Sequence, residues 1–412
     1  MSKHCLKSVC RSVCARSIRS LLQRYSDYLT ALGFSQPRRR RCALVLEHFG
    51  RWIGRRHISR PRVQEFVDQG LPNCLCLGVS RDRKLNRAAL NHMLAMLGSG
   101  REQSVYPPGH LGRLLRIYAE HLADTRGLAP DTVRRHLAYT QDMLRRFGVR
   151  RETQFRNWTP ELIEEDVARE GHCAPGRGRN VGWCARSFLR FLQQKGLIER
   201  DLAGAVPTVA RWRLASLPTT LSEAEIDRLL AAADLTTALG RRNYAIIVCL
   251  SELGLRGADV ANLQVDDIDF TAGTLRLRQR KERQADVFPL TSPLRLALQC
   301  YLQGFRPACT SSSVFVRHHA PLGKSLTSVG ICSVVLRLAD KAGLRHRVHG
   351  SHVLRRSLAS RMVNAGATLK QIADFLGHTS IDTTTLYAKV DLTTLSRVAL
   401  PWPTKERKAV RP

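Results

Sequence analysis

Hydrophobic residues recur at helical spacing along most of this chain and alternate with polar residues in one short region. Segment 185–197 is a clear helical case, with an apolar face made of Phe188, Leu189, Phe191 and Leu192. Alternation is found in three short segments that we expect to pair as antiparallel strands, 268–270, 274–278 and 286–290. The pattern predicts a mainly α-helical protein that contains one small antiparallel sheet.

The hydrophobic pattern of residues 1–105 returns in residues 106–205. At an offset of 93 residues, Leu21, Leu22, Tyr25 and Leu29 correspond to Leu114, Leu115, Tyr118 and Leu122. At an offset of 95, Leu94 and Leu97 correspond to Leu189 and Leu192. Helical spacing alone produces some matches of this kind. We nevertheless predict that one small helical domain has been duplicated.

Turn and cap residues divide the rest of the chain. Residues 206–220 contain two prolines and read as a linker. Ser222 and Glu225 form a capping box that opens a third domain, 221–395. Besides the strands, we expect this domain to contain helices at 243–253, 293–304, 326–342, 351–365, 368–376 and 380–390. Residues 396–412 read as a basic C-terminal tail.

The charge of the chain narrows the choice of partner. Its 412 residues include 66 Lys and Arg against 34 Asp and Glu, a net charge of +32. Such an excess favours a polyanion, because cations that neutralise phosphates release condensed counterions. A generally basic protein with no nucleic-acid partner is the alternative. Residues 1–105 alone contain 20 Lys and Arg against six Asp and Glu, so the charge is not confined to one tail.

The sequence favours neither a membrane-spanning protein nor a protein stabilised by disulfides. No apolar run approaches the roughly 20 residues that a membrane span requires, and the N-terminus lacks the apolar core of a signal peptide. The 12 cysteines include no Cys-x-x-Cys pair, so we expect reduced thiols and neither a disulfide framework nor a metal site. We expect a cytoplasmic protein.

Candidate chemistry gathers near the C-terminal end. His352 and Arg355 are three residues apart in a predicted helix, so the imidazole and the guanidinium share one face. His378 follows the helix-ending Gly377, and Tyr387 comes nine residues later. A tyrosine at short spacing from two histidines and an arginine is a candidate nucleophile with its activating groups.

Two earlier segments carry weaker signals. Arg256 follows a glycine break, and Asp259 lies three residues further on, where its carboxylate can orient a guanidinium that grips a phosphate. The alternative is a surface ion pair worth about 0–1 kcal/mol. Lys281 lies in the predicted hairpin turn 280–283, from which it can give a proton to a departing oxygen. The alternative there is a solvated basic turn.

Taken in order, these residues resemble the motifs of the tyrosine recombinase (phage integrase) family, in particular its Xer-like and integrase-like members. The matching segments are Gly254-Leu255-Arg256, Ser351-His352-Val353-Leu354-Arg355, Leu376-Gly377-His378 and Thr384-Thr385-Leu386-Tyr387. Arg356 stands where the family often has histidine, and the turn around Lys281 lacks the usual glycine, which makes Lys281 the least secure assignment.

The resemblance implies a fold and a set of domains. Residues 106–205 would be a SAM-like helical core-binding domain that clamps duplex DNA together with an α+β catalytic domain at 221–395. Residues 1–105 are not required by the minimal family plan. Their basic runs suggest further DNA contact, and a solvated face is the alternative.

The resemblance also implies the chemistry. A tyrosine hydroxyl has a pKa of about 10, so Tyr387 needs a base to become a nucleophile, and His352 is the preferred one. Arg256 and Arg355 would hold the two non-bridging phosphate oxygens in the transition state. The product would be a 3′-phosphotyrosyl bond and a free 5′-hydroxyl, formed without ATP, cofactor or metal.

Three supporting roles complete the site that the resemblance implies. Lys281 would protonate the departing 5′-oxygen. His378 would hydrogen-bond the phosphate, and Asp259 would orient the neighbouring arginine.

The expected partner is double-stranded DNA, bound by a homotetramer across two sites, with other recombinases or accessory proteins as further partners. The expected setting is the nucleoid, and the expected process is integration, excision or transposition of a mobile element. A type IB-like topoisomerase shares the chemistry. A DNA-binding architectural protein that has lost catalysis is an alternative of a different class.

Overall fold

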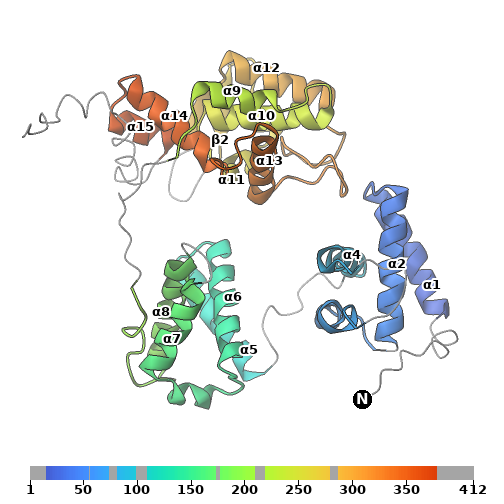
Figure 1. Ribbon diagram of the computed structural model, residues 1–412, viewed down its shortest axis with the longest axis vertical. Helices are drawn as coiled ribbons and strands as arrows, with labels where there is room; N and C mark the ends of the chain where they lie inside the picture. Colours follow the sequence, from blue (N-terminus) through green and yellow to red (C-terminus); the bar gives the residue numbers. More distant parts are fainter. Residues whose placement is uncertain are drawn as a thin grey trace, which may run out of the picture. The chain divides into compact units, whose positions relative to one another are not determined.

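The computed structural model describes residues 15–54, 56–73, 81–98, 109–172, 177–208, 219–278 and 286–377. The described chain is mainly helical and has one three-stranded sheet (Figure 1), which confirms the predicted fold class. It forms two compact units, one between Leu97 and Arg213 and one that combines Met1–Met96 with Leu214–Pro412.

The N-terminal helices form a small bundle. Apolar residues at helical spacing turn inward, and Tyr25, Leu29, Phe49, Phe66 and Leu90 are each at most 1% exposed. Helix α2 packs against both α1 and α4. The elements are α1 (Ala15–Ala31), α2 (Gln36–Ile53), α3 (Arg60–Glu65), the π-helical turn η2 (Phe66–Gly70) and α4 (Arg83–Met96).

The central unit is a second helical bundle with an aromatic core. Tyr118, Phe155, Phe188 and Phe191 are at most 1% exposed. Helices α6 and α7 begin at Pro130 and Pro160, and the Thr159 hydroxyl accepts a hydrogen bond from the Leu162 N–H at 3.4 Å. The elements are α5 (His110–Glu120), η3 (His121–Thr125), α6 (Pro130–Arg146), η4 (Glu152–Asn157), α7 (Pro160–His172) and α8 (Arg177–Gln194).

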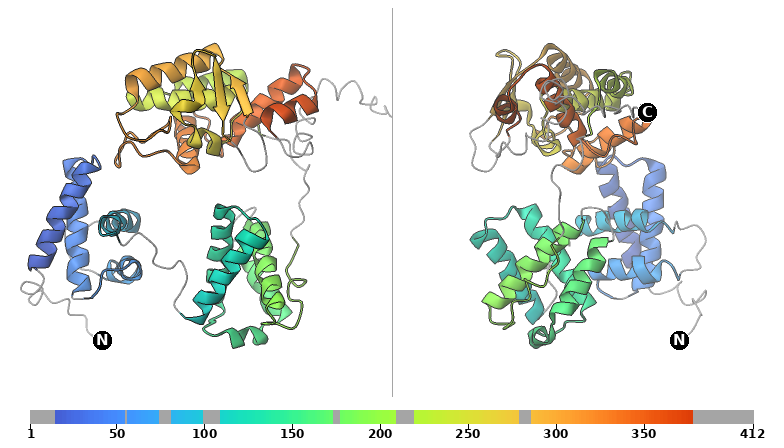
Figure 2. Two further views of the ribbon diagram at one scale, coloured as in Figure 1. Left: turned by 180° about the vertical axis from the view of Figure 1, so that it is seen from behind. Right: turned by 60° about the vertical axis from the view of Figure 1, so that its left-hand side comes forward.

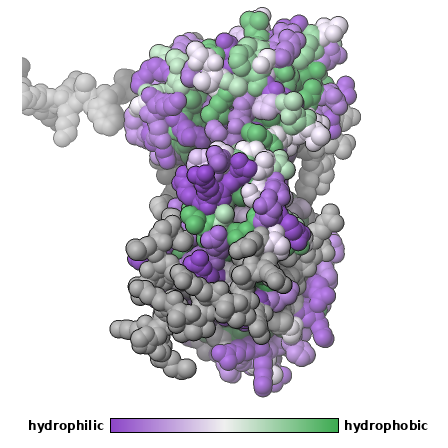
Figure 3. Space-filling view, turned by 90° about the vertical axis from the view of Figure 1, so that its right-hand side faces the viewer, coloured by the Kyte–Doolittle hydropathy of each residue, from purple (hydrophilic) through white to green (hydrophobic). Residues whose placement is uncertain are grey.

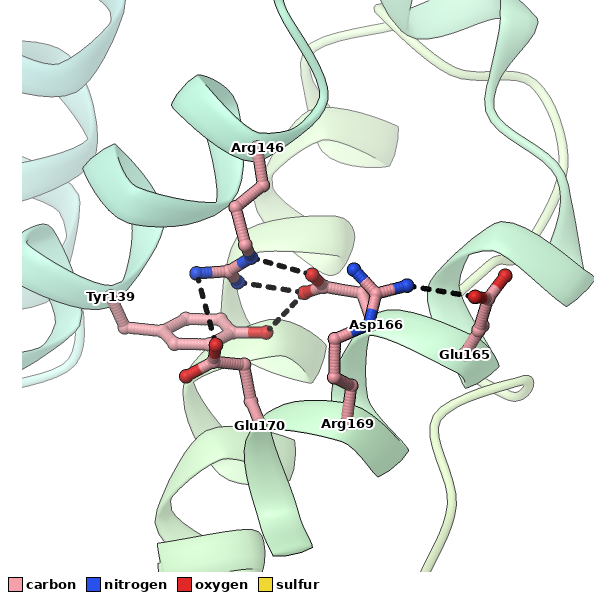
Figure 4. A network of polar contacts seen from close by, with 6 residues as sticks. All are labelled: Tyr139, Arg146, Glu165, Asp166, Arg169 and Glu170. Atoms are coloured by element: carbon pink, nitrogen blue, oxygen red, sulfur yellow. Dashed lines mark hydrogen bonds and ion pairs between the residues drawn. The ribbon is translucent and has the colours of Figure 1, made fainter. Parts of the chain in front are cut away.

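A buried ion pair joins α6 to α7 in this unit (Figure 4). The Asp166 side chain is only 1% exposed, and its two oxygens accept from Arg146 Nε at 2.6 Å and Nη2 at 2.8 Å. The Tyr139 hydroxyl donates to the same carboxylate at 3.3 Å, and Arg146 also lies 3.6 Å from Glu170. Burial and the Asp166 charge raise the pKa of Tyr139, so it remains a donor.

The helices from α9 onward surround a hydrophobic core whose buried residues lie between Leu221 and Leu354. Ser222 and Glu225 form the predicted capping box, since Glu225 N–H donates to the Ser222 hydroxyl at 3.3 Å and Ser222 N–H donates to the Glu225 carboxylate at 2.8 Å. The helical elements are α9 (Glu223–Ala231), α10 (Ala238–Glu252), α11 (Gly257–Asn262), η5 (Val265–Asp267), α12 (Ser292–Cys300), η6 (Tyr301–Phe305), α13 (Ser328–Lys341), α14 (His352–Asn364) and α15 (Leu369–Leu376).

Helix α10 is the centre of this core. It packs against α9, α12 and α14, and every residue from Ala245 to Leu250 is at most 2% exposed. The sequence pattern placed its start at 243, and the structure corrects this to Ala238, with the Thr237 hydroxyl as cap. The pattern misses the first turn because Arg242 is polar yet buried, with its Nη1 donating to the Val316 carbonyl at 2.9 Å.

The three predicted strands form an antiparallel sheet in the order β1-β2-β3. Leu275 is paired with Ile268 on one side and Phe288 on the other, and all three side chains face the core. The left view of Figure 2 shows the sheet in yellow. The strands are β1 (Ile268–Asp269), β2 (Thr274–Leu277) and β3 (Asp286–Pro289). Residues 279–285, which connect β2 to β3, lie outside the described residues.

Within the described residues, no helix has the length and apolar character that crossing a membrane requires. Figure 3 shows hydrophobic residues in small groups between polar ones on one face of the molecule.

Candidate active site

Arg256 lies at the cap position just before α11, where its backbone is extended. Its N–H donates to the Asp259 carboxylate at 2.9 Å, so this carboxylate fixes the backbone from which the guanidinium projects. At the other end of the side chain, Nη2 donates to the Gly377 carbonyl at 3.0 Å. The carboxylate of Asp259 thus contacts the backbone of Arg256, whereas the sequence predicts a carboxylate that orients the guanidinium.

Two glycines flank Arg256 because side chains there would collide with α14 and α15. A Cβ on Gly254 would lie 2.8 Å from a Leu376 methyl and 2.9 Å from a Leu358 methyl, and its φ of +59° is one that glycine adopts readily. A Cβ on Gly257 would lie 3.0 Å from the Ser351 hydroxyl. In the sequence, Gly254 is recognisable only as the glycine that breaks a helix. The second glycine three residues later was the available signal of a close approach.

Arg355 reaches the same place from α14. The residue is 5% exposed, its Nη1 donates to the Gly254 carbonyl at 2.7 Å, and its Nη2 donates to the Leu376 carbonyl. Arg256 and Arg355 thus bind the carbonyl oxygens of two consecutive residues at the end of α15. The two predicted guanidiniums, 99 residues apart in the sequence, converge on one backbone segment.

Leu376 and Gly377 form the C-terminal end of α15, and the packing of this helix fixes their position. The helix is capped by Thr368 and packs on α14 through a cluster that includes Val363, Ile372 and Leu376. It ends at Gly377 in the left-handed conformation, with φ 61° and ψ 50°. The two arginines are therefore fixed to the residues that immediately precede His378 in the chain.

His352 is the first residue of α14 and is exposed at its surface. Partial burial of the ring lowers its pKa from 6.5, and the positive charges of Arg355, Arg356 and Arg256 act in the same direction, while Asp259 opposes them. The imidazole is therefore neutral at neutral pH. A neutral imidazole can accept a proton, which is what a general base must do.

Arg356 does not share the buried position of Arg355. It is exposed, whereas the preceding Arg355 is buried, because successive helical residues point about 100° apart. The residue that departs from the family pattern therefore does not replace the buried guanidinium.

The structure thus brings together Arg256, Asp259, His352 and Arg355. Lys281, His378 and Tyr387 lie outside the described residues, so their assignments stay predictions from the sequence. Two positively charged forks beside a neutral imidazole can bind an anionic phosphate diester and accept a proton from a nucleophile that attacks it.

Comparison with known proteins identifies the class. The profile of the phage integrase family matches residues 219–393. An integrase/recombinase of Sinorhizobium fredii is 32% identical over 385 residues, which cover 92% of this chain and 93% of the relative. The tyrosine recombinase XerC of Oceanobacillus iheyensis is 29% identical over 289 residues, 66% of this chain and 90% of the relative. The chain therefore belongs to the phage integrase family and is a tyrosine recombinase, an enzyme of DNA recombination.

Solved structures support the fold. A lambda integrase dimer bound to a core site matches with a TM-score of 0.52 and 17% identity, over 72% of this chain and 99% of that one. The integrase of transposon Tn1549 bound to transposon right end DNA matches with a TM-score of 0.51 and 17% identity, over 70% of this chain and 99% of that one. At these identities, the likeness concerns the fold.

Proposed function

We propose that this enzyme cleaves and rejoins DNA strands at specific sites through a 3′-phosphotyrosyl intermediate formed by Tyr387. The observation that carries the proposal is the convergence of Arg256 and Arg355 on the carbonyl oxygens of Leu376 and Gly377. The chain that follows Gly377 contains His378 and Tyr387. The phosphate-binding groups are thus tied to the segment that leads to the nucleophile.

In the cleavage step, the Tyr387 oxygen attacks phosphorus while its proton passes to His352. Arg256 and Arg355 bind the two non-bridging oxygens and stabilise the charge that develops on them. The bond from phosphorus to the 5′-oxygen breaks, and Lys281 gives that oxygen a proton. His378 donates a further hydrogen bond to the phosphate.

In the joining step, the 5′-hydroxyl of the incoming strand attacks the phosphotyrosyl phosphorus. The tyrosine oxygen leaves and recovers a proton, so the bond energy is kept and neither ATP nor another cofactor is consumed. The same groups act in reverse order, because one phosphodiester replaces another. The site therefore supports exchange of strands as readily as resealing.

Strand exchange requires two DNA sites, and we infer that a homotetramer acts across two duplexes. Residues 106–205 would clamp the duplex together with the catalytic domain. The relatives named integrases support a role in integration, excision or transposition of a mobile element.

A nicked duplex tests the chemistry. Duplexes that the wild-type chain selects from a random library are nicked near the bound site, so that the freed end diffuses away and traps the covalent adduct. The wild-type chain should form a protein–DNA adduct, and Tyr387→Phe should abolish it without weakening binding. Tyr244→Phe, a half-buried tyrosine of the same domain, is the matched control and should retain adduct formation.

Three other outcomes would contradict the proposal. Adduct formed by the Tyr387→Phe variant would show that another residue is the nucleophile. Sequence-independent relaxation of supercoiled plasmid would favour a topoisomerase. Tight binding with no adduct from the wild-type chain would favour an architectural DNA-binding protein.

A further inference from the structure

The N-terminal bundle and the central unit share one backbone plan. Gly33 and Gly127 end their first helical segments with φ of 77° and 58°, and Gly54 and Gly148 follow α2 and α6 with φ of 60° and 62°. Both pairs are separated by 94 residues. Because positive φ is uncommon outside glycine, two such turns in the same register indicate the same chain path.

The buried faces of α2 and α6 coincide at that offset. Five of the seven buried positions of α2 fall on five of the seven buried positions of α6, although the residue types differ. They pair Cys42, Val45, Leu46, Phe49 and Gly50 with His136, Tyr139, Thr140, Met143 and Leu144. The two bundles are therefore copies of one module that pack different side chains in the same positions.

The outer faces also coincide, and here the residue type itself is shared. At the offset of 94, Arg40, Arg41 and Arg51 of α2 correspond to Arg134, Arg135 and Arg145 of α6, and all six are exposed. Packing does not constrain exposed positions, so packing does not explain the shared arginines. The first and last of each set lie eleven residues apart, three helical turns, and so share one face over about 16 Å.

The charge on this face is stronger in the N-terminal copy. In α6, Arg134 pairs with Asp131, and Arg145 pairs with Asp142. In α2, Arg51 lies 4.0 Å from Glu47, whereas Arg40 and Arg41 form no ion pair with any residue that the structure describes. The α2 face, where exposed arginines have few acidic neighbours, fits the phosphate backbone of DNA.

We propose that these two arginine faces are copies of one surface that binds the backbone of double-stranded DNA, so that each protomer holds DNA with two related modules. The proposal rests on the proposed function, because it assumes that DNA is the substrate. It assigns to residues 1–105 a contact with DNA made by the arginine face of α2.

The test compares three triple variants of the full-length chain. One is Arg40→Gln with Arg41→Gln and Arg51→Gln, and its counterpart is Arg134→Gln with Arg135→Gln and Arg145→Gln. The control removes the same charge from exposed arginines of the N-terminal bundle that have no arginine counterpart at the offset of 94, through Arg24→Gln, Arg60→Gln and Arg81→Gln. Thermal unfolding verifies that all three remain folded.

Affinity for a long mixed-sequence duplex is measured over a series of salt concentrations. Each lost phosphate contact should reduce the slope of log affinity against log salt by about 0.9. The α2 and α6 variants should therefore both lose about two to three in slope, and the control should lose much less. A slope for the α2 variant equal to that of the control would overturn the proposal. So would a loss of self-association in place of DNA affinity, which would point to a protein partner.

Adduct formation on the nicked duplex keeps the two proposals distinguishable. At low salt and saturating DNA, the α2 variant should form adduct at the wild-type rate, because the variant retains every group of the candidate active site. If the wild-type chain forms no adduct but the slopes differ as expected, the proposed chemistry fails and the DNA-binding face stands. If the wild-type chain forms adduct and the α2 slope matches the control, only the second proposal fails.

Discussion

Arg146 in the central unit and Arg355 in α14 are both held by short hydrogen bonds, but their acceptors differ. Arg146 donates two hydrogen bonds to the buried Asp166 carboxylate (Figure 4). Arg355 donates to the backbone carbonyls of Gly254 and Leu376. A carboxylate both orients a guanidinium and cancels its charge, whereas a carbonyl orients it and leaves the charge in place.

The difference separates an arginine that stabilises the fold from one prepared to bind an anion. In the central unit, the ion pair joins two helices, and the charges of Arg146 and Asp166 neutralise each other. In the catalytic domain, carbonyl acceptors fix the direction of the fork, so less reorganisation is needed when a phosphate binds. The comparison predicts that changes at the two sites will have effects of different kinds, on unfolding in one case and on cleavage in the other.

The largest expected effect is on stability, from Asp166→Ala. Removing the carboxylate takes away both short hydrogen bonds of Arg146 between α6 and α7 and leaves it only the longer contact with Glu170, which should cost about 3–5 kcal/mol in the free energy of unfolding. Chemical denaturation followed by circular dichroism measures the loss. Molecules that remain folded should cleave DNA at the wild-type rate.

A paired substitution sharpens that result. Asp166→Leu combined with Arg146→Met removes both charges and should recover most of the stability lost by the single variant. If the double variant were as unstable as the single one, the shape of the site and not the unpaired charge would explain the loss.

The next effect is on cleavage, from Arg355→Lys. Lysine keeps the charge but cannot hold the fork geometry, so we expect adduct formation to slow by about a hundred- to a thousandfold. Single-turnover adduct formation, normalised to the folded fraction, measures it. Arg356→Lys, at the neighbouring exposed position, should cleave normally. A stability loss without slower cleavage would place Arg355 in the same category as Arg146.

The sequence predicted the parts of this fold that depend on local signals. The strands, the Ser222 capping box and the helices from α12 to α15 all follow from periodicity and cap residues within a few positions. It did not predict the start of α10, because Arg242 is buried through a bond to Val316, 74 residues away. Local pattern cannot report a partner so distant in the chain.

The candidate site shows the same contrast between local signals in the sequence and contacts made by residues far apart in the chain. The spacing of His352 and Arg355 placed them on one helix, and the structure confirms that helix. The carbonyls of Leu376 and Gly377 have no side-chain signature, so their role as anchors for two arginines could not be read from residue types. Main-chain acceptors become visible only when the chain path is known.

The pH dependence of cleavage should give a smaller effect. Because the pKa of His352 lies below 6.5, the imidazole is already neutral at neutral pH and becomes protonated only in more acidic solution. Cleavage should therefore be constant around neutral pH and fall about tenfold per pH unit once the pH drops below that pKa. Single-turnover rates across an acidic pH series measure this, and His352→Gln should remove the inflection. Persistence of the inflection in that variant would assign the base to another group.

The smallest effect is expected at the pair beside the buried one, between Arg169 and Glu165. Arg169 Nη2 lies 2.8 Å from Glu165 Oε1, but the side chains are 58% and 72% exposed, so solvent screens their attraction (Figure 4). Glu165→Gln should change the free energy of unfolding by less than about 0.5 kcal/mol. Since Glu165 precedes Asp166 on the same helix, the same denaturation experiment measures both. A loss at Glu165 approaching that at Asp166 would show that burial of the acceptor is not what makes the Arg146 pair important.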